Sequence, residues 1–177
     1  MINRTLKVFV DFDGTITLED VGEAIFRKFG DVEKVNRIID DLLIDKISSK
    51  QCWDELCDSV NVISKNELDE FIDLIDIDPT FISFVKFCGD NDLELVVLSD
   101  GFDYYIDRLF NKAGLTEIKY YSNKLFVDEN GILKAAYPYF DSDSPTSANC
   151  KRNHIINHSS DDDYTIYIGD GNSDKDA

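Results

Sequence analysis

The chain has 177 residues, of which 43% are hydrophobic, enough to bury the core of one α/β domain with a modest insertion. Its 36 acidic residues outnumber 18 basic ones, so the formal charge of −18 argues against nucleic-acid binding and against docking on anionic lipid. The apolar run near the N-terminus is too short for an export signal or a membrane span. Four cysteines without a C-x-x-C pair predict reduced thiols in a cytoplasmic protein.

The first predicted element is a buried strand at residues 6–10, where β-branched and aromatic residues cluster. It runs directly into the acidic turn DFDGT (residues 11–15). From about residue 20 to 75, apolar residues recur at helical spacing, which predicts three or four helices with no strand among them. A further helix is predicted to begin at Pro79, with Asp78 as its N-cap.

The second half of the chain alternates predicted strands and helices. Residues 93–98 predict a second buried strand, which the sequence SDG (99–101) ends. Two apolar runs on either side of residues 128–131 predict a β-hairpin in which Asn130 and Gly131 supply the positive φ angles. The remaining predicted elements are helices at 102–113 and 149–158, a strand at 117–122, and a third buried strand at 164–168.

This order of elements predicts an α/β fold with a Rossmann-like parallel sheet, an inserted helical cap and a β-hairpin. The cap is expected at residues 16–78, because that helical block interrupts the alternation directly after the first strand. The α/β core is then expected to comprise residues 1–15 and 79–177.

Three of the predicted strands end in a polar signature: DFDGT after the first, SDG after the second and GDGNSD (169–174) after the last. In open α/β sheets, ligands bind outside the carboxyl ends of the strands. Lys151 lies between the second and third signatures, near the start of a predicted helix. These residues are therefore candidates for a single site at one edge of the sheet.

Asp11 and Asp13 leave the first strand at positions i and i+2, so their side chains are expected to share a face. Two carboxylates crowded together repel, and a divalent cation relieves that repulsion while also screening an incoming phosphate. Asp170 can complete such a site from a neighbouring strand. Because only oxygen ligands are offered, the expected metal is Mg²⁺.

The same acids can carry phosphoryl-transfer chemistry. A carboxylate can act as a covalent nucleophile and form an aspartyl-phosphate. A second acid can protonate the leaving group and later activate water. Lys151, the Ser99 hydroxyl and the backbone near Gly14 and Gly101 offer the positive charge and donors that a transferring phosphate needs.

The ordered set DFDGTIT (11–17), SDG (99–101), Lys151 and GDGNSD (169–174) resembles the haloacid dehalogenase superfamily of phosphatases, and the resemblance spans nearly the whole chain. It implies Asp11 as nucleophile and metal ligand, and Asp13 as general acid/base with its backbone carbonyl on the metal. It also implies Ser99, Gly101 and Lys151 as the phosphate-binding residues. Finally, it implies Asp170 as a direct Mg²⁺ ligand and Asp174 as an auxiliary acid behind the ligands.

An insertion directly after the first motif is similar to the small cap of the phosphoserine phosphatase-like branch. Within that branch, the stretches at 98–106 and 149–152 look closest to the MtnX-like phosphatases, which act on a phosphorylated diketone or enol. Phosphoserine phosphatases carry a cap arginine that grips the substrate carboxylate, and the corresponding segment at 51–57 has none. Asp20 falls where the branch often places an acid that meets the substrate, so it is a candidate specificity residue.

The expected substrate is thus a small phosphorylated metabolite, and the sequence does not indicate an oligomeric state. Phosphoserine phosphatase stays the near alternative within this branch, and two other classes stay open: a phosphotransferase of the same fold, and a non-catalytic or truncated phosphate-binding module. Since the family continues past its fourth motif with a further helix and strand, the C-terminal part of the core is expected to be missing here.

Overall fold

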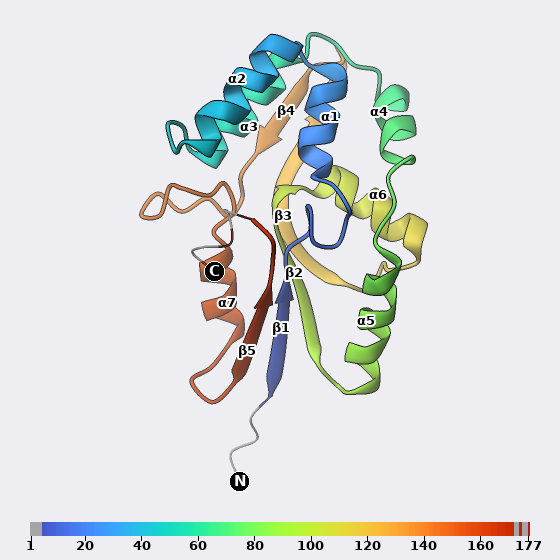
Figure 1. The fold of residues 1–177 in the computed structure, drawn as a ribbon, viewed down its shortest axis with the longest axis vertical. Coiled ribbons are helices and arrows are strands. Elements are labelled where there is room, and N and C mark those ends of the chain that lie inside the picture. The colour runs from blue at the N-terminus through green and yellow to red at the C-terminus, as the bar shows by residue number, and fades with distance from the viewer. Residues whose placement is uncertain (1–4, 172–173, 175–176) are drawn as a thin grey trace.

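The computed structural model describes residues 5–171, 174 and 177 (Figure 1). A block of helices follows the first strand, after which strands and helices alternate. In chain order the elements are β1 Leu6–Val10, α1 Val21–Phe29, α2 Val32–Leu43, α3 Ser49–Ser59, α4 Lys65–Ile72, α5 Pro79–Asp90, β2 Glu94–Phe102, α6 Asp103–Ala113, β3 Lys119–Val127, β4 Leu133–Ala136, α7 Lys151–His158 and β5 Tyr164–Ile168.

Within the described residues, five strands form one sheet in the order β4-β3-β2-β1-β5. β1 pairs in parallel with β2 and with β5, and β2 pairs in parallel with β3, whereas β3 and β4 are antiparallel. The carboxyl ends of β1, β2 and β5 therefore meet at one edge, the upper edge in Figure 1. The predicted α/β fold with a mostly parallel sheet is confirmed.

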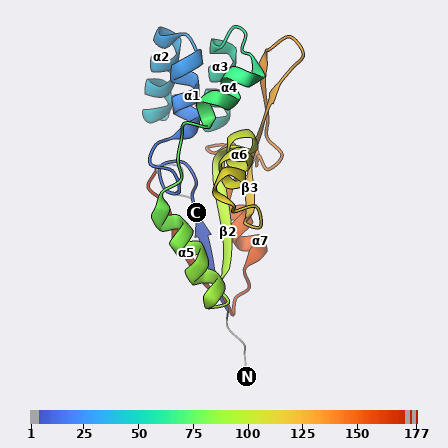
Figure 2. The same cartoon turned by 90° about the vertical axis from the view of Figure 1, so that its right-hand side faces the viewer.

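Helices cover both faces of the sheet, as the view from the side shows (Figure 2). Alternate residues of β1 explain this, because successive side chains of a strand point to opposite faces. Val8 and Val10 join a core with residues of α5 and α6, whereas Phe9 packs in a smaller cluster with Ile155 of α7.

Helices α1 to α4 lie above the carboxyl edge of the sheet (Figure 1). The segment that carries them leaves and rejoins the sheet layer at one point, where Thr17 and Ile77 form an antiparallel bridge. Asp20, Asp31 and Ser48 begin α1, α2 and α3 as N-caps, each accepting a hydrogen bond from the backbone of its helix. Four helices match the three or four that the apolar spacing predicts.

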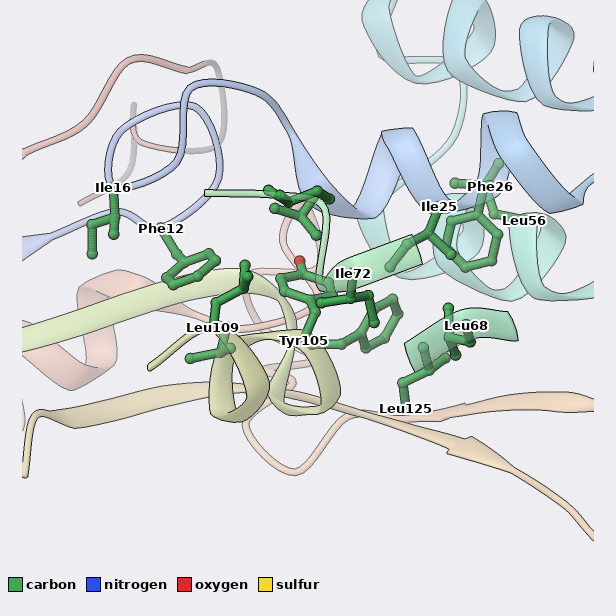
Figure 3. Close-up of a cluster of buried hydrophobic side chains, with 14 of the residues drawn as sticks. Phe12, Ile16, Ile25, Phe26, Leu56, Leu68, Ile72, Tyr105, Leu109 and Leu125 are labelled. Carbon is green, nitrogen blue, oxygen red and sulfur yellow. The ribbon is translucent and has the colours of Figure 1, made fainter. Parts of the chain in front are cut away.

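The helical segment shares one hydrophobic core with the sheet. Phe12 and Leu109 meet Ile25, Leu56 and Leu68 in a continuous cluster of buried side chains (Figure 3). All five are at most 2% exposed. Apolar burial contributes roughly 25 cal/mol per Å², so this shared core helps to hold the helices on the sheet.

Strand β3 corrects one sequence prediction. The spacing predicts a strand at 117–122 and a separate hairpin strand from residue 125, but β3 runs unbroken over Lys119–Val127. Its first half pairs with β2 and its second half with β4. Asn123, at the junction of the two halves, is fully buried and donates from Nδ2 to the Asp100 carbonyl at 2.6 Å.

The turn of the hairpin and strand β5 differ from prediction as well. In this turn only Gly131 adopts a positive φ, +78°, and Asn130 does not, because the loop is a turn closed by Asp128 rather than a two-residue turn.

Strand β5 is not buried as predicted. It pairs only with β1 at the edge of the described sheet, which leaves Tyr164 and Ile166 57% and 45% exposed. An apolar run predicts a strand without indicating how well it is covered.

None of the helices in the described residues is both long enough and apolar enough to cross a bilayer.

The hairpin tip generates a test of the fold. A Cβ on Gly131 would lie 2.8 Å from the Ile63 carbonyl oxygen in addition to straining the positive φ, so Gly131→Ala is expected to lower the free energy of unfolding by about 2 kcal/mol. Gly89 lies in α5 with open space around it, so Gly89→Ala is expected to raise that free energy by about 0.5–1 kcal/mol. Urea denaturation measures both, and equal effects would contradict the described turn.

Candidate active site

Asp11 stands directly after β1, where its backbone N–H donates to Ile168 of β5 at 2.8 Å. The side chain is buried, and its Oδ1 accepts hydrogen bonds of 2.8 Å from Lys151 Nζ and from the Phe12 N–H. Burial raises the pKa of Asp11 to about 6, because the loss of solvent outweighs the attraction of Lys151. Asp11 is thus a rigidly held carboxylate. Its Oδ1 makes both of these contacts, and its Oδ2 makes neither.

Lys151, the first residue of α7, is 2% exposed and pairs with two carboxylates. Its Nζ lies 2.8 Å from Asp11 Oδ1 and 2.6 Å from Asp174 Oδ1. Burial alone would lower the pKa of Lys151, but Asp11 and Asp174 raise it above its usual value, so the ammonium keeps its charge. Burial likewise opposes ionisation of Asp174, yet Lys151 holds the pKa of that carboxyl below its usual range.

Asp170 completes a group of three acids with Asp11 and Asp174. Each offers one carboxylate oxygen, and these oxygens lie within 4.8 Å of one another. Gly14 makes room for this arrangement, since a Cβ on it would lie 2.6 Å from Asp170 Oδ2. Three hard oxygen ligands at one point fit a cation such as Mg²⁺, whereas zinc prefers nitrogen and sulfur ligands.

Asp13 has a different set of partners from Asp11. Its Oδ1 accepts from the Val21 N–H at 3.0 Å, and its Oδ2 accepts from the Tyr105 hydroxyl at 2.8 Å and the Ser99 hydroxyl at 3.2 Å. Burial and the nearby charge of Asp20 raise the pKa of Asp13 well above its ordinary value, although the bond from Tyr105 opposes them. Asp13 therefore holds a proton more readily than an exposed aspartate.

A layer of buried polar groups supports Ser99 from behind. The Asn149 side chain donates from Nδ2 to the Ser99 carbonyl at 2.8 Å, and the Asn149 N–H donates to Asp100 Oδ1 at 2.6 Å. His154 Nε2 lies 2.7 Å from Asn149 Oδ1. Burial lowers the pKa of His154 to about 4, so the ring is neutral. Because an amide oxygen can only accept, we assign the ring proton to Nε2, which donates to Asn149 Oδ1.

A cavity of about 690 Å³ opens between these residues and the helices above them. Its floor includes Asp11, Asp13 and Asp170, and Asp20 lies at its wall as the N-cap of α1. Apolar side chains from the helical segment form much of the rest: Leu18, Ile39, Leu42, Leu43, Cys52, Trp53 and Leu56. No lysine, arginine or histidine is among the described residues that line the cavity.

The predicted site residues thus fall into two neighbouring groups. Asp11, Asp170, Asp174 and Lys151 gather around one point. Ser99 and Gly101 lie with Asp13, with the Gly101 N–H donating to Ser99 Oγ at 2.9 Å. Residues 172–173 of the GDGNSD motif lie outside the described residues.

Sequence reasoning gave no site role to Asn149, Asp100 or Tyr105. Asp100 lies inside the SDG signature, and its pKa is raised by burial while Ser49 Oγ of α3 and the Asn149 N–H donate to it. The position of Asn149 two residues before Lys151 is a usable signal for it. No local pattern indicates that the Tyr105 hydroxyl reaches Asp13.

Comparisons with known proteins show the family of the chain. The family described as Putative Phosphatase matches residues 6–176. The chain belongs to this phosphatase family. Its relatives include Pdp3-interacting factor 1 of Schizosaccharomyces pombe, 30% identical over 98% of this chain and 78% of the relative. They also include a 2-hydroxy-3-keto-5-methylthiopentenyl-1-phosphate phosphatase of Bacillus mycoides, 28% identical over 98% of this chain and 79% of the relative.

Solved structures share the fold of this family member. A phospho-aspartyl intermediate analogue of phosphoserine phosphatase superposes with a TM-score of 0.71 at 20% identity, over 97% of this chain and 80% of that chain. A substrate-bound phosphoserine phosphatase gives a TM-score of 0.72 at 18% identity, over the same shares. The resemblance to haloacid dehalogenase phosphatases is therefore confirmed, and the chain is a phosphatase enzyme of that type.

The paired charges around Lys151 generate a stability test. Lys151→Met keeps the apolar stem but leaves Asp11 and Asp174 without the ammonium, so we expect a loss of about 3 kcal/mol in the free energy of unfolding. Urea denaturation in a chelator measures this loss. Lys46→Met removes an exposed pair with Asp41 and is expected to cost under about 1 kcal/mol. Similar losses for both variants would show that the buried contacts do not stabilise the fold.

Proposed function

We propose that this chain hydrolyses small phosphomonoesters in a Mg²⁺-dependent reaction that passes through an aspartyl-phosphate on Asp11. The observation that carries the proposal is the buried Asp11 carboxylate at the floor of a cavity, which Lys151 holds beside Asp170 and Asp174. A carboxylate fixed next to a buried ammonium and a cation-binding cluster is suited to attack a phosphorus atom whose charge both can offset.

The residues present fit the metal that this reaction requires. In the proposal, Asp11, Asp170 and the backbone carbonyl of Asp13 hold Mg²⁺, and Asp174 supports the group through its bond to Lys151. When bound, Mg²⁺ offsets the negative charge of the carboxylates and of the phosphate.

In the first step, an Asp11 oxygen attacks phosphorus as the bond from phosphorus to the leaving oxygen breaks. Lys151, the Ser99 hydroxyl and the Gly101 N–H hold the phosphate oxygens, the last two exchanging their present bonds for bonds to phosphate. Asp13, whose pKa is raised by burial, gives its proton to the leaving oxygen. The products are an alcohol and an aspartyl-phosphate.

In the second step, Asp13 acts as a base. It takes a proton from water, and the oxygen of that water attacks phosphorus as the bond to Asp11 breaks, which restores both acids and releases phosphate. Residues 16–78 act as a cap in this scheme, since their helices roof the cavity and limit the entry of water. Four buried free cysteines support a reducing compartment such as the cytoplasm.

The side chains that line the cavity also support a proposal about the class of substrate. A substrate carboxylate would face Asp20 and Glu23 with no basic side chain among the described lining residues to receive it. Apolar lining suits a leaving group with a neutral, partly apolar body. We therefore favour a neutral leaving group over phosphoserine, in keeping with the substrate that the names of the bacterial relatives print.

The central test is Asp11→Asn, which removes the nucleophile while keeping the shape of the side chain. We expect the rate of phosphate release from 4-nitrophenyl phosphate to fall by about 10³-fold or more, with an unchanged far-UV circular dichroism spectrum. Chelation of the wild type is expected to abolish turnover, and added Mg²⁺ to restore it.

The reaction mixture should contain no alcohol other than the product, because a phosphotransferase would then release little free phosphate. Asp31→Asn, which alters a helix cap outside the cavity, is the control and should retain wild-type turnover. Sustained phosphate release by the Asp11 variant, or full activity in chelator, would contradict the proposed reaction.

A second test concerns Asp20. Asp20→Asn keeps the N-cap of α1 and removes one negative charge from the cavity wall. We expect the kcat/KM for phosphoserine, relative to that for glycerol 2-phosphate, to rise about fivefold, which corresponds to about 1 kcal/mol of charge repulsion. An unchanged ratio would show that Asp20 does not select against a substrate carboxylate.

A further inference from the structure

We propose that Tyr105 is a positioning residue for Asp13, and that Gly101 is glycine because the Tyr105 hydroxyl occupies the space of a side chain there. The inference rests on the proposed function, in which Asp13 is the acid that protonates the leaving oxygen.

Tyr105 is held in one place by its surroundings. It belongs to α6, is fully buried, and its ring packs against Phe12 and Phe102 with ring centroids 5.9 Å and 6.4 Å away. Figure 3 shows its side chain among the apolar residues that join the sheet layer to the helices above, with the hydroxyl oxygen as the polar atom of the group. Packing of this kind fixes the ring, so the hydroxyl is a donor at a fixed point.

That donor serves Asp13. The hydroxyl oxygen lies 2.8 Å from Asp13 Oδ2, and the Val21 N–H holds the other oxygen at 3.0 Å. Ser99 also donates to Oδ2, at 3.2 Å, but in the proposed reaction its hydroxyl turns to the phosphate. Tyr105 is then the remaining side-chain donor to Oδ2 within the described residues.

The geometry at Gly101 shows that the backbone accommodates this contact. A Cβ on Gly101 would lie 1.6 Å from the Tyr105 hydroxyl oxygen and 2.6 Å from Asp13 Oδ2. Gly101 is not among the glycines with a positive φ, so the need for glycine is steric and not conformational. Any side chain at residue 101 would displace the tyrosine hydroxyl from Asp13.

The step that depends on this contact is the first one. The phosphorus–oxygen bond to the leaving group breaks, the Asp11–phosphorus bond forms, and the proton of Asp13 passes to the leaving oxygen. Orientation of the carboxyl group governs that proton transfer, and a small misplacement slows such a step markedly. The effect is greatest for a leaving group that needs the proton.

The test compares two leaving groups in Tyr105→Phe. The kcat/KM for glycerol 2-phosphate, whose alkoxide needs a proton, is expected to fall about tenfold or more. The kcat/KM for 4-nitrophenyl phosphate, whose leaving group needs none, is expected to fall less than about threefold. Equal losses for the two substrates, or no loss, would overturn the positioning role.

Tyr104→Phe is the matched control. Tyr104 is the neighbouring residue of α6 and also donates its hydroxyl to a carboxylate, Asp69 of α4, at 2.6 Å and outside the cavity. It should leave both kcat/KM values within about twofold of the wild type. A leaving-group effect of the same size in this variant would also overturn the proposal, because it would show a general response to losing such a bond.

A stability measurement tests the contact without relying on activity. Gly101→Ala should destabilise the wild type more than it destabilises the Tyr105→Phe variant, because the closest overlap is with the hydroxyl oxygen. Equal losses in both backgrounds would contradict the contact itself. If the wild type hydrolyses neither ester with Mg²⁺, the proposed function fails and the catalytic part of this inference with it, whereas the coupling still decides whether Tyr105 and Gly101 share this space.

Discussion

The site depends on how the fold stabilises several carboxylates that lie close together at the carboxyl edge of the sheet. Asp11 and Asp174 touch the same buried ammonium of Lys151, and Asp170 approaches both from the next strand end. One lysine offsets only part of this charge, which leaves the group attractive to a cation. Loss of solvent is the main reason that the pKa of Asp11 is raised, and the nearby charge of Asp174 adds to this rise against the attraction of Lys151.

The residues of the site are held by different parts of the backbone, so the site requires the whole carboxyl edge of the sheet to be in place. Asp11 is held by its backbone bond to β5, and Lys151 by the start of α7. Ser99 is braced through Asn149 and the neutral ring of His154. Groups held by separate rigid elements keep their separations when a ligand binds, which is the condition for electrostatic preorganisation.

The sequence predicts the acids of this site better than their supports. Asp11, Asp13 and Asp170 follow short apolar runs, and in a parallel sheet such positions converge whatever the details of packing. Tyr105 contacts Asp13 across elements that are distant in the chain, and no local pattern encodes such a contact. The exposure of β5 and the unbroken course of β3 likewise depend on neighbours in space.

The buried cluster that runs from Phe12 through Ile25 to Leu68 has a thermodynamic consequence. A helical module that kept its own separate core could melt before the sheet and give two calorimetric peaks. Here side chains from the sheet layer and from the helices pack in one cluster, so neither layer can unfold without exposing apolar surface of the other. We therefore expect the sheet layer and the helices above it to unfold together in a single cooperative transition on heating.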